Sequence, residues 1–280
     1  ACKTKKIVLF QYNISFCDLL CLTILRCVKP QRIAPQTYTI YGLNGALEVL
    51  NAQDYSINYI DIKSRSAAEK DQKINSLIKN YKSKVKILNA DKFSIKYSQL
   101  RTQGIVVSFE GQIKKDLPQF NNNDDIALLL GDQIKDPQNL GQIIRTAECS
   151  GIDGLIIPDR DSAQITNSVL QVSQGAFASL PIYSCGNVQQ TLQQLKKEGF
   201  WIIGVENDTN GKLWYEIDYT GKVIIVIGSE GKGIRQLVKH NCDFIATIPM
   251  QGKINSLNVS ASVSAILFER QRQISTKVKE

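Results

Sequence analysis

Polar side chains and glycines gather in three segments of the second half of the chain, at residues 131–151, 223–234 and 248–269. In each segment they stand beside a short apolar run that has the length of a buried strand. Open α/β sheets bind their ligands in the crevice at the carboxyl ends of their strands. The arrangement therefore predicts one ligand site to which all three segments contribute.

The first segment predicts a helix with one basic side chain facing away from the core. Asp136 can cap a helix that starts at Pro137, because proline has a helical φ and lacks an N–H that the first turn would leave unpaired. The apolar residues at helical spacing, which predict the face packed on the sheet, are Leu140, Ile143, Ile144 and Ala147. Arg145 lies about 150° from the centre of that stripe at roughly 100° per residue. Its guanidinium either remains solvated or binds a phosphate or a developing oxyanion.

The second segment is an apolar run followed by a glycine-rich loop from Gly228 to Gly233. Glycines in such a loop let a ligand approach the backbone closely. The loop contains Glu230 and Lys232, but it lacks both the Lys-Ser/Thr pair of a Walker motif and the glycine spacing of a dinucleotide motif. A phosphate-binding NTPase is therefore disfavoured, and a plain glycine-rich turn is the alternative to a ligand-binding loop.

The third segment leads through Gly252 and Ser256 into a helix of small residues, which permit close packing against backbone. Asn258 is expected in the first turn of this helix, where amide side chains and free backbone N–H groups can hold a polar ligand. A tightly packed terminal helix without a ligand is the alternative.

The elements that must position these segments form an α/β domain. Short apolar runs, with helical patterns between most of them, lie at 126–130, 154–158, 181–185, 200–205, 223–228 and 243–249. Strands buried on both faces have this composition. Residues 126–280 are therefore expected to form a mostly parallel sheet with helices on both faces.

The first part of the chain predicts a smaller α/β domain at 39–110. Strand patterns at 57–62, 85–88 and 104–109 accompany a polar helical pattern around 72–80. Residues 111–125 contain Pro118 and consecutive asparagines without apolar periodicity, so a linker is expected there. Residues 1–38 hold six basic residues and one acidic residue. This composition resembles an organelle transit peptide, and a basic arm without fixed structure is the alternative.

The composition disfavours several classes of protein. Among 280 residues, 34 Lys and Arg against 26 Asp and Glu give a net charge of +8, which suits a phosphate-rich partner. The seven cysteines include no C-x-x-C pair and the one histidine is His240, so neither a disulfide framework nor a Cys/His zinc site is expected. His240 is expected to cap a short helix. No run approaches the roughly 18 apolar residues of a membrane span, so a soluble protein without metal or membrane is expected.

Read in order, the three segments carry D-x-x-x-D-P-x-N-x-G-x-x-x-R-T-A, V-I-G-S-E-G-x-G and I-P-M-x-G-x-x-x-S-L-N-V-S. These resemble the three motifs of the SpoU/TrmH ribose methyltransferases of the SPOUT superfamily. VSQGAFASLP at 172–181 resembles their connecting segment, so the resemblance extends over about 126–273. YGLNGALEVL at 41–50 and TQGIVV at 102–107 resemble the ribosomal-protein-like domain of members that modify large-subunit ribosomal RNA.

The resemblance implies a C-terminal domain with a deep trefoil knot, a homodimer, and S-adenosylmethionine as cofactor. It implies methylation of a ribose 2′-hydroxyl, and the ribose belongs to a guanosine in large-subunit ribosomal RNA. The expected location is the mitochondrion or otherwise the cytoplasm. The residues it places around the reacting groups are Asn139, Arg145, Glu230, Ser256 and Asn258. Those it places at the cofactor are Ile227, Gly228, Ile248, Met250 and Leu257.

Two points stay open at this level. The family proposal makes Arg145 the base, which conflicts with a guanidinium that stays protonated in proteins, so we favour Arg145 as the group that holds a phosphate and stabilises the alkoxide. The alternatives for function are a non-catalytic RNA-binding protein of ribosome assembly, with the same fold, and a tRNA 2′-O-methyltransferase.

Overall fold

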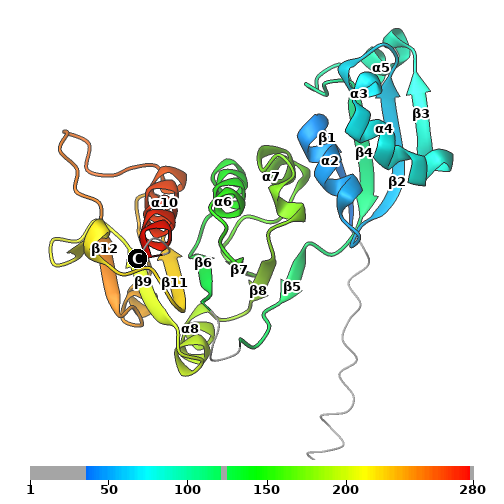
Figure 1. Ribbon diagram of the computed structural model, residues 1–280. Coiled ribbons are helices and arrows are strands. Elements are labelled where there is room, and N and C mark those ends of the chain that lie inside the picture. Colours follow the sequence, from blue (N-terminus) through cyan, green and yellow to red (C-terminus); the bar gives the residue numbers. More distant parts are fainter. Residues whose placement is uncertain (1–35, 121–124, 278–280) are drawn as a thin grey trace, which may run out of the picture. The chain divides into compact units, whose positions relative to one another are not determined.

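The computed structural model describes residues 36–120 and 125–277. The extension predicted at 1–38 falls almost wholly outside the described residues. The described strands form two sheets, one of four strands and one of eight (Figure 1).

The four-stranded sheet has the order β1-β4-β2-β3 and belongs to the first part of the chain. Its strands are β1 (Thr37–Tyr41), β2 (Ser56–Lys63), β3 (Val85–Leu88) and β4 (Ile105–Glu110). Its helices are α2 (Leu43–Asn51), α3 (Ala67–Lys70), α4 (Gln72–Ile78), the 3₁₀ helix η1 (Lys79–Lys84) and α5 (Ala90–Lys96). The predicted strands and the polar helix are confirmed. The sequence analysis missed α5, which Asn89 caps and which buries Phe93.

The eight-stranded sheet has the order β10-β12-β9-β11-β6-β7-β8-β5, and every pairing in it is parallel. Its predicted strands are β6 (Ala127–Gly131), β7 (Gly154–Pro158), β8 (Ile182–Cys185), β9 (Trp201–Val205), β11 (Val223–Ile227) and β12 (Phe244–Thr247). The short strands β5 (Lys114–Asp116) and β10 (Lys212–Leu213) complete it. The parallel α/β fold expected from the apolar runs is confirmed, and the segment expected to be a linker contributes β5 to one edge.

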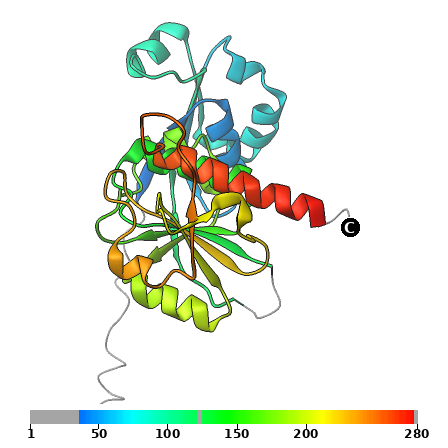
Figure 2. The same cartoon turned by 90° about the vertical axis from the view of Figure 1, so that its left-hand side faces the viewer.

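Alternate residues of the central strands face two different apolar layers. Leu129, Ile225 and Ile227 pack in one cluster with residues of the helices α6 (Pro137–Cys149), α7 (Asn167–Val172) and α10 (Val259–Lys277). Leu128 and Val226 pack in another, with residues of α8 (Val188–Lys197) and α9 (Gln236–Lys239). Figure 2 shows α10 and α8 on opposite faces of the sheet. The 3₁₀ helices η2 (Ala176–Ala178) and η3 (Trp214–Glu216) complete the described helices.

Local signals place both helices that carry the candidate residues. Asp136 accepts hydrogen bonds from the backbone N–H groups of Gln138 and Asn139, so α6 begins at Pro137 as predicted. All four residues of the predicted stripe on α6 are buried, and Arg145 is exposed. Asn258 stands one residue before α10 rather than in its first turn, and its Oδ1 accepts from the Ser260 N–H at 2.9 Å. His240 ends α9 as its C-cap, as expected.

Among the helices of the described ranges, none combines the length and the apolar character needed to cross a bilayer.

Candidate functional site

The strand order brings the three polar segments to one edge of the sheet. β12, β9, β11 and β6 are consecutive neighbours and all run parallel, so the loops after them leave the same edge. Those loops carry the first, second and third segments together with Glu206, which directly follows β9. The crevice predicted from the sequence is thus formed by neighbours in the sheet.

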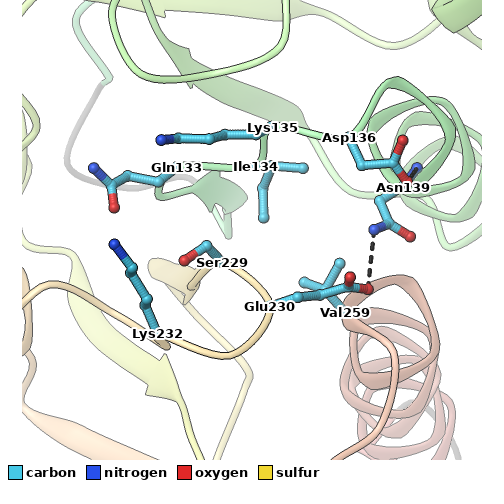
Figure 3. Close-up of a pocket in the computed structure, with 9 residues that line it drawn as sticks. All are labelled: Gln133, Ile134, Lys135, Asp136, Asn139, Ser229, Glu230, Lys232 and Val259. Carbon is cyan, nitrogen blue, oxygen red and sulfur yellow. Dashed lines mark hydrogen bonds between the residues drawn. The ribbon is translucent and has the colours of Figure 1, made fainter.

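Three side chains, one from each segment, form a hydrogen-bonded cluster at this edge. The Asn139 amide donates to Glu230 Oε1 at 3.0 Å (Figure 3), and the Asn258 amide donates to the same oxygen at 2.7 Å. The Asn258 amide also lies 2.9 Å from Asn139 Oδ1, which accepts from it. Two amides on one carboxylate oxygen hold that carboxylate in a fixed position.

The loop after β11 is closed on itself. The Ser229 N–H donates to the Gly233 carbonyl at 3.1 Å, and the Gly233 N–H donates back to the Ser229 carbonyl at 3.0 Å. A Cβ on Gly228 would meet the Gly233 carbonyl carbon at 2.1 Å, so only glycine allows this approach. The tip of the loop therefore presents Glu230 and Lys232 at a fixed spacing.

An ion pair ties this loop to the end of β6. Asp132 is fully buried, and its carboxylate accepts from the Arg235 N–H at 3.1 Å and from Arg235 Nε at 2.9 Å. Arg235 Nη2 lies 2.6 Å from Asp132 Oδ1. The hydrogen bond with Asp132 raises the pKa of Arg235. The pair fixes the second segment against the first.

A cavity of about 600 Å³ lies under the loop and the third segment. Ligand sites for small molecules measure about 300–1,000 Å³. All five residues predicted at the cofactor line it: Ile227, Gly228, Ile248, Met250 and Leu257. Three of the five residues predicted at the reacting groups also line it: Glu230, Ser256 and Asn258.

Glu206 also lines this cavity and has an unpartnered oxygen. Its Oε2 is buried and accepts no hydrogen bond from the residues that the structure describes, whereas its Oε1 lies 3.4 Å from Lys239 Nζ. Lys239 Nζ lies closer to Asp208, at 2.7 Å from Oδ2, and the hydrogen bond between them lowers the pKa of Asp208 and raises that of Lys239. A buried acceptor without a donor costs free energy, so Glu206 Oε2 is a group that a ligand or a water could pair with after a movement of the side chain. Sequence reasoning missed Glu206, although it directly follows a strand that the sequence predicted.

Arg145 is the predicted site residue that lies apart from the others. It is exposed on α6 and lines neither this cavity nor the smaller one beside Asn139. A single chain thus brings together the asparagines, the glutamate and the glycine-rich loop without the arginine. In the described part of the chain, no three His, Cys, Asp or Glu side chains group as metal ligands.

Comparison with known proteins identifies the family. The sequence profile of the SpoU rRNA Methylase family matches residues 128–268. The chain belongs to this family. Its resemblance to SpoU methylases, inferred from the three motifs, is confirmed.

Two relatives show how far the similarity extends. A 23S rRNA (guanosine-2′-O-)-methyltransferase, RlmB, of Coxiella burnetii is 37% identical over 245 residues, which cover 84% of this chain and 95% of that protein. A protein of Staphylococcus saprophyticus named as a TrmH family tRNA/rRNA methyltransferase is 44% identical over 142 residues. That match covers 51% of this chain and spans only 57% of the relative.

A solved structure shares the fold of this SpoU family member. The AdoMet-bound rRNA methyltransferase of Sinorhizobium meliloti superposes with a TM-score of 0.70 at 20% identity, over 85% of this chain and 88% of that one. At this identity the likeness extends to the fold alone.

Proposed function

We propose that this protein transfers the methyl group of S-adenosylmethionine to the 2′-hydroxyl of a guanosine in large-subunit ribosomal RNA. One observation carries the proposal: the three family motifs meet in the Asn139–Glu230–Asn258 cluster at the wall of a ligand-sized cavity. Membership of the SpoU family supports the reaction class. The name of the Coxiella burnetii relative supports the guanosine and the ribosomal RNA.

The cavity fits the cofactor in size, in its apolar lining and in charge. When bound, S-adenosylmethionine supplies an electrophilic methyl carbon on a sulfonium. Ile248, Met250 and Leu257 offer apolar surface to its base, and the closed loop that Gly228 permits forms part of the cavity wall. The carboxylates of Glu206 and Glu230 line the cavity and favour a positively charged sulfur.

The side-chain cluster acts on the substrate ribose. Attack on a methyl group must be in line, so much of the rate comes from holding the hydroxyl in position. Asn139, Glu230 and Asn258 form the fixed polar surface that orients the hydroxyl, with Ser256 beside them on the cavity wall. The proton of the hydroxyl leaves through water or through Glu230.

Arg145 reaches the ribose from the partner subunit of a homodimer. Its exposure on α6 and its absence from both cavities of a single chain support this arrangement. Its guanidinium holds the adjacent phosphate and stabilises the developing alkoxide through two parallel donors. We expect Arg145→Lys to lose most of the methylation rate, because an ammonium group lacks the two parallel N–H donors of a guanidinium. A variant with near-full activity would contradict this role.

Three further parts belong to the proposal. Residues 126–280 form the catalytic domain with a trefoil knot, and residues 39–110 form a ribosomal-protein-like domain that binds RNA. Segment 111–125 connects them and contributes β5 to the edge of the catalytic sheet. The run from Lys79 to Arg101 in the first domain holds seven basic residues and one acidic residue, which supports an RNA surface there. Residues 1–38 direct the protein to the mitochondrion, which a fluorescent fusion with and without them would test.

The decisive experiment combines cofactor binding with mapping of the product. Purified protein should bind S-adenosylmethionine in a calorimeter and transfer its methyl group to unmodified large-subunit ribosomal RNA. Mapping of 2′-O-methyl groups in cells that lack the protein should reveal one missing site in that RNA. A missing site in tRNA would point to the tRNA enzyme, and no cofactor binding at millimolar concentration would point to the non-catalytic RNA-binding protein.

A further inference from the structure

A second cavity, of about 240 Å³, lies beside the cofactor cavity. Figure 3 shows the residues that line it: Gln133, Ile134, Lys135, Asp136, Asn139, Ser229, Glu230, Lys232 and Val259. Ser229, Glu230, Lys232 and Val259 line both cavities. A ligand in the second cavity would thus meet a ligand in the first across the tip of the glycine-rich loop.

The two carboxylates of the second cavity are already occupied by donors. Glu230 Oε1 accepts from two asparagine amides, and each oxygen of Asp136 accepts a backbone N–H at the start of α6. The asparagine–glutamate pair marks one side of the cavity, as Figure 3 shows. Glu230 Oε2, which accepts no hydrogen bond from the described residues, is the oxygen that this side offers to a hydroxyl.

The other side of the cavity is cationic. The amines of Lys135 and Lys232 and the amide of Gln133 lie away from the asparagine–glutamate pair (Figure 3). Neither lysine forms an ion pair with any carboxylate in residues 36–120 or 125–277. Two ammonium groups without a carboxylate partner favour an anion between them.

The backbone holds these groups in place. Gln133 has a φ of 62°, a left-handed conformation that glycine adopts more easily, so the turn keeps an amide side chain at a strained position. Lys232 lies on the closed loop. Arg235, three residues later, forms the ion pair with Asp132. The backbone that carries Lys232 is therefore positioned by the same contacts that position Glu230, whereas the side chains of Lys135 and Lys232 are exposed.

We propose that Lys135 and Lys232, with Gln133 as an additional donor, form a subsite for the 3′-phosphate of the target nucleotide, which they hold together with the guanidinium of Arg145. This rests on the proposed function. In RNA the 2′-hydroxyl and the 3′-phosphodiester are attached to neighbouring ribose carbons, so a nucleotide presents a hydroxyl and an anion side by side. The cavity presents their complements, amide and carboxylate groups at one side and ammonium groups at the other.

The test compares Lys135→Gln, Lys232→Gln and the double variant with wild-type protein on unmodified large-subunit ribosomal RNA. We expect each single change to raise KM for RNA about tenfold with kcat nearly unchanged, because each removes one charge-assisted hydrogen bond to the phosphate. The slope of log affinity against log salt should fall by about 1 for each ammonium group removed from the phosphate. S-adenosylmethionine affinity, measured by calorimetry, should not change in Lys135→Gln, because Lys135 lines only the smaller cavity. Lys197→Gln, an exposed lysine of α8 without an ion pair in the described structure, is the matched control.

A second arm identifies the phosphate itself. Once the target nucleotide is mapped, an RNA fragment with a neutral methylphosphonate on its 3′ side should bind wild-type protein more weakly. The double variant should bind this RNA no more weakly than it binds the unmodified fragment. Equal losses in both proteins, or an unchanged KM in the double variant, would overturn the subsite. RNA binding that weakens in the double variant, with a lower salt slope, by a protein that never methylates RNA would instead overturn the proposed function and leave the subsite standing.

Discussion

At the scale of single residues, Asn139 shows how a buried amide serves a site. It is 6% exposed, stands in the first turn of α6, and links Glu230 to Asn258 through its two side-chain atoms. Its position is set locally by the Asp136 cap, whereas its partners come from residues about a hundred positions later in the chain.

We expect Asn139→Ala to lower kcat by about 100-fold, the effect of removing one positioned donor from an active site. The affinity for S-adenosylmethionine should stay within a few-fold, because Asn139 lines only the smaller cavity. Single-turnover methylation and calorimetry measure the two effects. Asn210→Ala, at an exposed asparagine that lines neither cavity, is the control, and an Asn139 variant with unchanged kcat would remove Asn139 from the catalytic cluster.

At the scale of elements, the glycine-rich loop is held by a backbone approach that no side chain could replace. Gly228→Ala would place a methyl group about where the Gly233 carbonyl now lies, so the loop must move. We expect S-adenosylmethionine to bind at least about tenfold more weakly, a loss of about 1.4 kcal/mol. Calorimetry measures it. Gly186→Ala is the control, since a Cβ there meets nothing within 4 Å, and equal affinities for the two variants would contradict the role of the loop.

The ion pair between Asp132 and Arg235, which holds the same loop, leads to a separate prediction about the stability of the protein. Arg235→Ala leaves a fully buried carboxylate without its partner, which destabilises proteins by about 3 kcal/mol. The midpoint of urea unfolding should fall accordingly. Arg160→Ala, at an exposed arginine without an ion pair in the described structure, should leave the midpoint unchanged. If both variants unfold alike, the pair contributes little to the fold.

At the scale of the whole molecule, the position of Arg145 predicts shared active sites. If each site takes Arg145 from its partner, Arg145→Ala and Glu230→Gln chains should both be inactive alone. Mixed before assay, they should recover about a quarter of the wild-type rate: random pairing makes half the molecules heterodimers, and each heterodimer holds one intact site. Light scattering should give twice the 31.3 kDa of one chain. Failure to recover activity would place Arg145 in the site of its own subunit.

Local patterns in the sequence determined the elements and most of the candidate residues. The cap at Asp136, the stripe on α6 and the short apolar runs depend on neighbours within a few residues, so they can be read from the chain alone. The family motifs then named ten site residues, of which eight line the larger cavity and Asn139 lines the smaller one.

Only the tertiary structure decided which of these groups touch. The order β12-β9-β11-β6 joins Asn139, Glu230 and Asn258, and no local pattern specifies which strands become neighbours. Glu206 became a candidate only because its Oε2 is buried, and Lys135 only because it lines the same cavity as Lys232. Burial and strand order depend on contacts between residues far apart in the sequence. The spacing of residues along the chain reflects only contacts between residues close in sequence.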